Sequence, residues 1–403
     1  MDKRNQIHFT YKKLHTEIKH KLLRASLESS LGIASALANT YSYLDLFAGA
    51  GIFKEGGGIG SPVIAYETFK KHYEKDIPNH NVETFWMHLC EKDESTYREL
   101  NRNIKKLGIK ESPFIKGFIR RDWEDEIQTI KKVISKAPYG FFFVDQFSTE
   151  LDLLKFLPLL EGNPYEVLVF FNQNTLSRQK GRLHENDIKR ISKVLGVPEK
   201  KVRDIPDPEF KDFVISTLQK HFSNFRNYVA IAAIPITREG SIVDMDYFYL
   251  LFATGHPIIM DSFLSTYNEI IIKRRKEVSP MHAKLKGTLF NPSPTYNIEE
   301  DLISFLRGKK SCTLNEVFQF LSQEFLSWKA YVRSNYSVPT LRNITYALRQ
   351  LEKRSIVNLS GHEKFVYKRG PRNKLGEKGQ INPDYLKSYK QLQEIKVTYC
   401  SRL

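Results

Sequence analysis

The chain has 403 residues, 41% of them hydrophobic and 27% charged, which is the composition of a folded globular protein with room for two domains. No apolar run reaches the roughly 18 residues of a membrane-spanning helix, and Cys90, Cys312 and Cys400 lie too far apart for a disulfide framework or a metal knuckle. We therefore expect a cytoplasmic protein without a membrane partner or a metal site, and the net charge of +16 favours polyanionic partners.

Five segments are expected along the chain. Apolar residues such as Ile18, Leu22 and Leu31 recur at helical spacing before the first strand, so residues 1–40 are expected to form a helical lead-in. An α/β core should follow at 41–276, and proline and glycine accumulate in a linker at 277–297. The remainder is expected to form a winged-helix domain at 298–370 and a basic tail at 371–403.

The stretch Tyr43–Gly51 reads as a buried strand that runs into a glycine turn. Gly49 and Gly51 would let the backbone approach a ligand closely, and open α/β sheets bind ligands beyond the carboxyl ends of their strands. Asp45, two residues before Phe47, can bind the amino-acid end of S-adenosylmethionine, which brings the stretch closest to methyltransferases. A turn without a ligand is the alternative. The spacing matches neither a P-loop nor a dinucleotide-binding dehydrogenase.

Further strands and helices alternate after this turn. An antiparallel hairpin that closes an otherwise parallel sheet is typical of a Rossmann-like class I methyltransferase, and this α/β fold is the one that we expect. The strands are expected at Thr84–Glu91, Pro113–Phe118, Tyr139–Asp145 and Glu166–Phe171, the helices at Val63–Tyr73, Lys92–Leu107 and Trp123–Ser135, a helical insert at Ser177–Pro208, and the hairpin at Tyr228–Pro235 and Tyr247–Ala253.

Polar side chains follow several of these strands. Glu91 ends the second strand, where a carboxylate can accept hydrogen bonds from both ribose hydroxyls of an adenosyl group. Asp122 could accept from the adenine amino group while Trp123 covers the ring, although Asp122 could equally be a helix N-cap. Asp145 ends a wholly apolar strand that should be buried on both faces. The sequence thus predicts a cofactor site that includes Asp45, Phe47, Gly49, Gly51, Glu91, Asp122 and Trp123.

The last 106 residues carry 19 Lys and Arg against 10 Asp and Glu, which indicates a nucleic-acid partner, although a basic tail without a partner is the alternative. Three helical patterns and a small hairpin predict a winged helix-turn-helix whose third helix would enter a major groove. A protein-docking module is the alternative here. The residues expected to meet nucleic acid, with DNA favoured, are Arg342, Asn343, Tyr346 and Arg349 on that helix, and Lys364, Lys368 and Arg369 near the wing.

Several of these stretches together resemble the three-Cys-motif partner proteins (TcmP). The resemblance is carried by Asp45–Gly51, Gly60–Pro62, Glu91–Asp93, Val144–Phe147 and Tyr249–Pro257. It implies a class I methyltransferase-like core with an appended winged helix, a setting near mobile or defence genes, and a protein partner that carries the three-cysteine motif. The family tends to have Asp-Pro-Phe after the fourth strand, whereas Gln146 replaces the proline here.

The reaction remains open between two hypotheses. Amino-methyltransferases that act on bases use an Asp or Asn, two prolines and an aromatic residue, and Asp145 and Phe147 could take the carboxylate and aromatic parts on a flipped base. Both prolines are missing, and the Pro-Cys pair of cytosine C5 enzymes is absent as well. The first hypothesis is therefore a methyltransferase that acts on DNA or RNA. The second is a binding protein of a defence system that senses a nucleotide or holds a partner.

Overall fold

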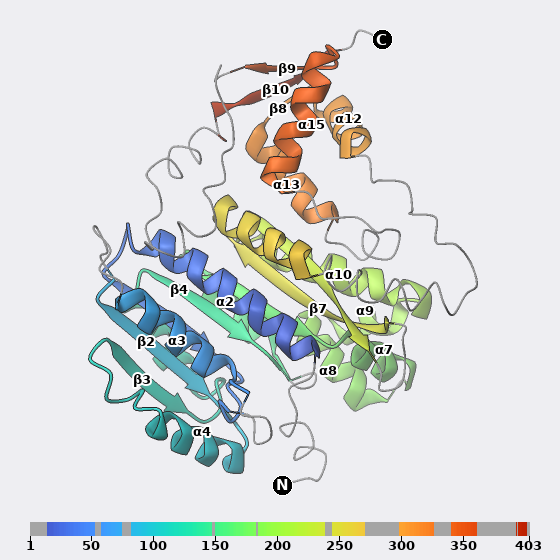
Figure 1. The fold of residues 1–403 in the computed structure, drawn as a ribbon. Helices are drawn as coiled ribbons and strands as arrows, with labels where there is room; N and C mark the ends of the chain where they lie inside the picture. The colour runs from blue at the N-terminus through green and yellow to red at the C-terminus, as the bar shows by residue number, and fades with distance from the viewer. Residues whose placement is uncertain are drawn as a thin grey trace, which may run out of the picture.

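The structure is a computed structural model, and it describes residues 14–52, 58–74, 82–146, 150–182, 184–237, 244–270, 298–325, 340–360, 392 and 394–400. Figure 1 shows a large α/β unit and a smaller C-terminal unit. Within the described part of the chain, no helix combines the length and the apolar character that a membrane crossing needs. Nor do the described residues include a cluster of three or more side chains placed to ligate a metal.

The centre of the large unit is a seven-stranded sheet with the order β3-β2-β1-β4-β5-β7-β6. The first five strands are parallel, and β7 runs antiparallel to both β5 and β6, so the predicted sheet and its closing hairpin are confirmed. The strands are β1 (Thr40–Asp45), β2 (Thr84–Cys90), β3 (Ile115–Arg120), β4 (Tyr139–Val144), β5 (Glu166–Phe171), β6 (Tyr228–Thr237) and β7 (Asp244–Thr254).

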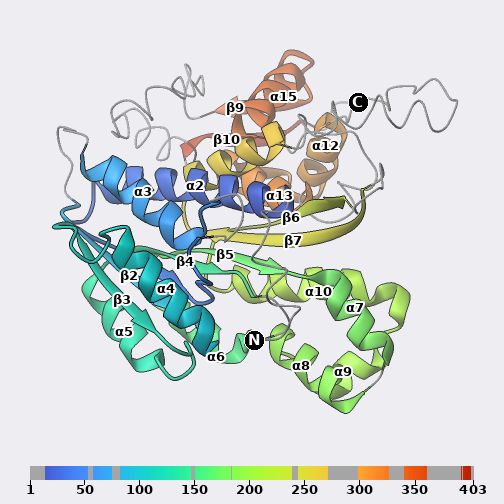
Figure 2. The same cartoon turned by 60° about the horizontal axis from the view of Figure 1, so that its bottom comes forward.

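Helices cover both faces of this sheet (Figure 2). The first face packs against α2 (Leu14–Ala34), α3 (Ser61–Tyr73), α4 (Glu94–Lys106) and a helix over residues 257–270. The second face packs against α5 (Ile127–Lys136), the short α6 (Leu153–Phe156) with a 3-10 turn (Leu157–Leu160), and the helices α7 (Gln173–Arg182), α8 (Glu185–Leu195), α9 (Glu199–Asp204) and α10 (Asp207–Ser223).

Strand β4 shows why the middle of the sheet is apolar. Its residues Phe141 to Val144 are all fully buried, because helices lie on both sides of a central parallel strand. Gly140 pairs with Ser42 of β1, and a Cβ atom at this glycine would lie 2.5 Å from the Ser42 Oγ and from the Tyr165 ring. Only glycine therefore lets Tyr165 pack across the start of the strand.

The C-terminal unit contains α12 (Ile298–Lys309), α13 (Leu314–Phe325), α15 (Leu341–Lys353) and a sheet of β8 (Ser311–Thr313), β10 (Lys396–Tyr399) and β9 (Val357–Ser360), in that order. All three predicted helices are present. The described partner of β9 is β10, a strand that the sequence did not predict, whereas the expected wing strand near Lys364 lies outside the described residues. The winged helix itself therefore stays a prediction.

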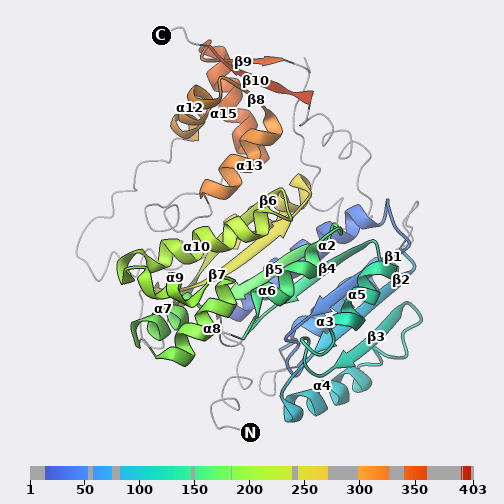
Figure 3. The ribbon, with the colours of Figure 1, turned by 180° about the vertical axis from the view of Figure 1, so that it is seen from behind.

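Buried polar contacts join the C-terminal unit to the core. Figure 3 shows α13 beside β6, and the Tyr228 hydroxyl of β6 bonds to the Asn315 Oδ1 of α13. The Leu341 N–H, at the start of α15, donates to the Asp261 Oδ1 in the helix over residues 257–270, at 2.9 Å. The core therefore supplies the acceptor for one backbone N–H at the N-terminus of α15.

Candidate functional site

The glycine turn after β1 is a backbone cradle. Gly49 and Gly51 have φ values of 61° and 75°, a left-handed conformation that side chains with a Cβ adopt at a cost. The Gly60 N–H donates to the Gly51 carbonyl at 2.8 Å, and a Cβ at Gly60 would lie 2.9 Å from that oxygen. The two chain segments thus meet without side chains between them, at the carboxyl edge of the sheet and at the start of α3.

A pocket of about 750 Å³, part of it open to solvent, lies beside this turn. Its described lining comes from the first turns of α2, the glycine turn, the start of α3, the ends of β4 and β5, and the first half of β7. The predicted residues Phe47, Gly49, Gly51 and Asp145 line it. The full lining is Thr16, Lys19, His20, Phe47, Ala48, Gly49, Ala50, Gly51, Ile52, Gly60, Ser61, Asp145, Gln146, Phe170, Asn172 and Phe248.

Asp45 lies behind the turn and does not line the pocket. Its side chain is fully buried and accepts hydrogen bonds from the Tyr43 hydroxyl at 3.1 Å, from the Phe47 N–H at 3.3 Å and from Ser61. Burial raises the pKa of Asp45 to about 7, and the nearby Asp145 carboxylate adds to this shift. Near neutral pH the charge of Asp45 therefore responds to whatever charge enters the pocket.

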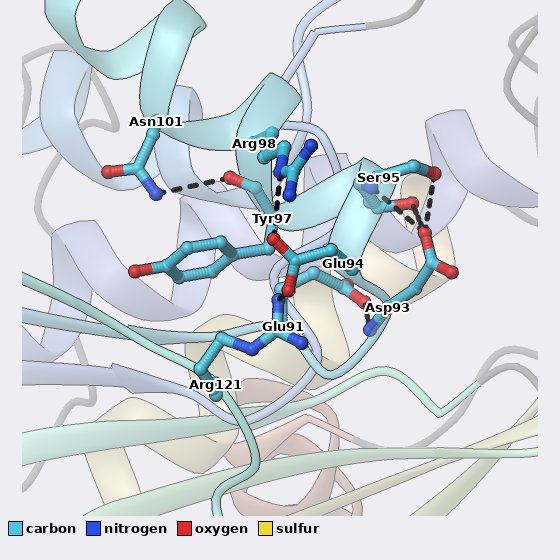
Figure 4. Close-up of polar contacts among 9 residues, drawn as sticks. Glu91, Asp93, Glu94, Ser95, Tyr97, Arg98, Asn101 and Arg121 are labelled. Atoms are coloured by element: carbon cyan, nitrogen blue, oxygen red, sulfur yellow. Dashed lines mark hydrogen bonds and ion pairs between the residues drawn. The ribbon is translucent and has the colours of Figure 1, made fainter.

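Glu91 follows β2 and supports the same turn. Figure 4 shows Glu91 beside Asp93 and the first turn of α4. Its two carboxylate oxygens accept from the Gly49 N–H at 3.1 Å and from the Asp93 N–H at 2.8 Å. Asp93 in turn caps α4, because its Oδ1 accepts from the Thr96 N–H at 2.9 Å. Burial raises the pKa of Glu91. Each of its oxygens keeps acceptor capacity, since a carboxylate oxygen can take two hydrogen bonds.

The other two predicted adenosyl-binding residues follow β3, and like Glu91 they lie outside the described lining of the pocket. Asp122 accepts from Lys92 at 2.7 Å and from the Glu124 N–H at 3.1 Å, so it is engaged in a turn. Trp123 is 3% exposed and meets Phe156 edge to face, with ring centroids 6.5 Å apart, in the core of the second face. The roles of Asp122 and Trp123 in cofactor binding stay predictions.

Asp145 lies at the end of β4 and forms an ion pair with Lys19 of α2. The Lys19 ammonium also lies 4.4 Å from the centroid of the Phe170 ring. Gln146, where the resembling family tends to have proline, is 2% exposed and accepts from the Glu150 N–H at 2.9 Å and the Leu151 N–H at 2.8 Å. The side-chain oxygen of Gln146 thus joins the end of β4 to residues 150 and 151. Phe147 lies outside the described residues.

The predicted nucleic-acid residues are only partly described. On α15, Tyr346 is 67% exposed, and Asn343 is exposed but bonds back to the Thr340 N–H at 3.2 Å as part of a capping box. Arg349 is half-exposed and lies 3.5 Å from the Glu352 carboxylate. The side chain of Arg342 and the whole of Lys364, Lys368 and Arg369 lie outside what the structure describes.

Sequence reasoning missed the contribution of α2 to the pocket. Thr16, Lys19 and His20 line it, although the segment was predicted only as a helical lead-in. The signal was present in the sequence, because Lys19 lies three and four positions before Leu22 and Leu23 and so shares their helix face, where it is 6% exposed. A lysine on the buried face of a helix implies a buried anion.

The residues present fit an adenosyl cofactor with an amino-acid end. The cradle of Gly49, Gly51 and Gly60 admits close backbone approach, Glu91 has acceptor capacity for hydroxyl groups, and Lys19 and Asp145 offer one charge of each sign in the pocket. This donor set suits hydroxyl, ammonium and carboxylate groups.

No protein-family model matches the sequence, and the comparison with curated proteins gives no match. Solved structures that match the chain include the methyltransferase domain of bacterial CtHen1-C (12% identity, 58% of this chain and 99% of that chain, TM-score 0.27). A second is a protein of Staphylococcus aureus assigned as a caffeoyl-CoA O-methyltransferase (9% identity, 55% of this chain and 79% of that chain, TM-score 0.27). A third is a protein of Streptococcus pneumoniae assigned as a tRNA methyltransferase (13% identity, 73% of this chain and 96% of that chain, TM-score 0.28). Similarity at this level carries no argument about fold or function.

Proposed function

We propose that the protein binds S-adenosylmethionine and is a class I methyltransferase. The observation that carries the proposal is the hydrogen bond between the Glu91 carboxylate and the Gly49 N–H, which joins an acidic strand end to the glycine turn at one edge of the sheet. The strand order with a reversed β7 supports it, since class I methyltransferases use this arrangement. Ligands of open α/β sheets bind at this edge.

In this proposal each side chain has a defined task toward the cofactor. Glu91 accepts from the ribose hydroxyls, the backbone at Gly49 and Gly51 lies against the amino-acid part, and Asp45 supplies negative charge behind the turn. Asp122 and Trp123 are assigned to the adenine end, next to Glu91. The bound cofactor supplies an electrophilic methyl group on a positively charged sulfur.

Calorimetry with S-adenosylmethionine tests the cofactor site. Glu91→Ala removes two hydrogen bonds to a charged acceptor, at roughly 1.5–3 kcal/mol each, so affinity should fall about a hundredfold or more. The matched control is Glu94→Ala, which removes an exposed carboxylate three residues away that pairs with Arg98 and Arg121 instead. The proposal fails if the wild type shows no binding, or if the two variants bind alike.

The acceptor side is assigned to Asp145 and Phe147, with a nucleic acid as the substrate. Asp145 would accept a hydrogen bond from the acceptor amine, and Phe147 would stack on a base. Asp145→Ala should abolish methyl transfer from labelled cofactor to DNA or RNA without weakening cofactor binding. Undiminished transfer by the variant would remove Asp145 from the reaction.

A second candidate function is a nucleotide-sensing or partner-binding component without catalysis. The observation in its favour is that Asp145 is already paired with Lys19, and that Gln146, which stands in place of proline, is engaged by the N–H groups of Glu150 and Leu151. In this case the wild type would bind the cofactor and transfer no methyl group to any nucleic acid. Through the resemblance, both proposals also include membership of the TcmP family, a setting near defence genes and a protein partner of the three-Cys-motif type.

For nucleic acid, the exposed side of α15 is the proposed contact surface. Since the N-terminus of α15 is bonded to Asp261, the contacts fall to Tyr346 and Arg349, further along the helix. Arg349→Ala should lower the slope of log affinity against log salt by about 0.9, the value for one phosphate contact. Fluorescence anisotropy of a labelled duplex measures it, with Lys309→Ala on α12 as the control.

Deletion of the C-terminal unit is a poor alternative to these point variants. It would expose the Tyr228 hydroxyl and the Asp261 carboxylate, together with the apolar surface that α13 covers on β6. A loss of binding after deletion would therefore mix unfolding of the core with loss of contacts. An unchanged salt slope in Arg349→Ala and Tyr346→Ala would instead assign α15 to protein docking.

A further inference from the structure

Lys19 is a cation buried in the wall of the pocket. Its side chain is 7% exposed, against 23% for its partner Asp145, and its ammonium faces the Phe170 ring. The two residues are 126 positions apart in the sequence, on α2 and after β4. Among the described lining residues Lys19 is the sole Lys or Arg, with His20 beside it. A carboxylate that enters this pocket therefore has one strong cationic partner there.

Stability alone gives little reason for this pair. A buried ion pair commonly contributes no more than well-packed apolar residues of similar volume, because both charges lose their hydration. The surroundings of Lys19 include the rings of Phe170 and Phe248, whose centroids are 4.8 Å apart and which would suit an apolar side chain. A charged residue in this place is better explained by a ligand that needs it.

We propose that Lys19 binds the carboxylate of the cofactor's amino-acid end and, in doing so, releases Asp145 toward the acceptor. The proposal deepens the proposed function and rests on it. In the free protein Asp145 is the anion that Lys19 requires. When the ligand carboxylate replaces it, Asp145 is the member of the pair that can lose its partner, because it is the more exposed to water.

This exchange makes Lys19 a specificity-determining residue. A ligand with the same adenosyl group but no carboxylate would have to bind while Lys19 stays paired with Asp145. Such a ligand gains no charge-assisted hydrogen bond from Lys19. The pocket should therefore prefer the complete amino-acid end, and the preference should depend on the ammonium of Lys19 in particular.

Three ligands separate the contributions in calorimetry: S-adenosylmethionine, its decarboxylated analogue, and 5′-methylthioadenosine, which lacks the amino-acid end. The wild type should bind the decarboxylated analogue about tenfold to a hundredfold more weakly than the parent compound, the value of one hydrogen bond between charged groups. In Lys19→Met the two should bind alike, and Lys19→Arg should keep most of the preference. Lys21→Met, on the exposed side of α2, is the matched control and should behave as the wild type.

The measured quantity is the ratio of the affinities for S-adenosylmethionine and its decarboxylated analogue within one variant. A general loss of stability would lower both affinities and leave this ratio unchanged. Thermal unfolding of each variant shows that it is folded before titration. If Lys19→Met keeps the wild-type preference, or if the wild type binds all three ligands equally, the assignment of Lys19 is wrong while the adenosyl site stands. If the wild type binds none of the three, the proposed function itself fails.

Discussion

Helix α2 carries a buried polar contact near each end, and the two ends differ. Near its C-terminus, Ser30 bonds to the Tyr41 hydroxyl at 2.7 Å and to the Glu166 carboxylate at 2.5 Å. Toward its N-terminus, roughly 16 Å away at 1.5 Å per residue, Lys19 pairs with Asp145. One cluster lies where β1 and β5 begin, and the other where β4 ends.

The cluster at the strand starts is closed. Arg226 donates to the carbonyls of Tyr165 at 2.6 Å, Phe225 at 2.7 Å and Leu160 at 3.3 Å, and to the Asn163 Oδ1 at 3.1 Å. The Lys19 ammonium, in contrast, has one carboxylate and one aromatic ring on the wall of a pocket. Saturated polar groups thus hold the sheet together at one edge, whereas groups with spare hydrogen-bonding capacity at the other edge are available to a ligand.

The largest expected effect is on the closed cluster. Arg226→Leu would remove the donor of four hydrogen bonds, two of them buried, and the positive charge near Glu166, so unfolding free energy should fall by roughly 3–5 kcal/mol. Urea unfolding followed by circular dichroism measures the loss. Arg203→Leu on α9, whose ion pairs are at 3.7 and 4.0 Å and exposed, is the control and should change stability by less than about 1 kcal/mol. Equal losses in the two variants would contradict the closed cluster as a source of stability.

A second effect concerns pH. Burial raises the pKa of Glu166 from 4.5 to about 7, so the folded state disfavours its charge. Its contribution to stability is fully present below pH 4.5 and is lost as pH rises through about 7. Glu166→Gln should remove this loss, worth roughly 3 kcal/mol at 1.36 kcal/mol per pKa unit.

The measurement is the difference in unfolding free energy between wild type and Glu166→Gln across that window. Taking the difference cancels the other groups that titrate there, among them His88, whose pKa burial lowers to about 4. A difference that stays constant with pH would show that folding does not shift the pKa of Glu166, and the contrast between the two clusters would lose its electrostatic part.

At the open edge the third effect is on ligand affinity. Asp45 has a pKa of about 7 because it is buried, and a positively charged ligand in the adjacent pocket favours its ionised form. Affinity for S-adenosylmethionine should therefore fall as pH drops below about 7, by up to tenfold per pH unit. Asp45→Asn should bind with a flatter pH profile. Cofactor binding should release the proton that Asp45 loses, and calorimetry in buffers of different ionisation enthalpy counts this proton directly. Identical pH profiles of affinity for the wild type and Asp45→Asn would exclude Asp45 as its source.

Much of the fold could be predicted, because the strands carry strong patterns. The apolar run of β4, the glycine turn after β1 and the hairpin of β6 and β7 each have a local signal. Strand β10 could not be predicted, since it has four residues, one of them a fully buried valine, Val397, and no turn residues around it. Its partner β9 lies far away in the sequence.

The candidate site was predictable only where the turn residues themselves form it. Phe47, Gly49, Gly51 and Asp145 meet at the pocket because carboxyl ends of parallel strands share one edge. The lysine of α2 was not predicted, since its pairing with Asp145 depends on how a helix crosses the sheet. Trp123 was predicted to cover a ligand but is buried in the core. An aromatic residue after a strand can do either, and the sequence pattern is the same for both.

The smallest expected effect is the stability change of Lys19→Met, and it decides whether the two ends of α2 truly differ. The substitution removes the partner of Asp145, whose side chain keeps 23% exposure and can be hydrated, and places an apolar side chain beside Phe170 and Phe248. We expect a change of about 1 kcal/mol or less in unfolding free energy, against roughly 3–5 kcal/mol for Arg226→Leu. Urea unfolding of both variants under one set of conditions gives the comparison. A loss of several kcal/mol in Lys19→Met would make the Lys19–Asp145 pair a structural contact like the one at the other end, because a pair that stabilises the fold so strongly is costly to exchange for a ligand.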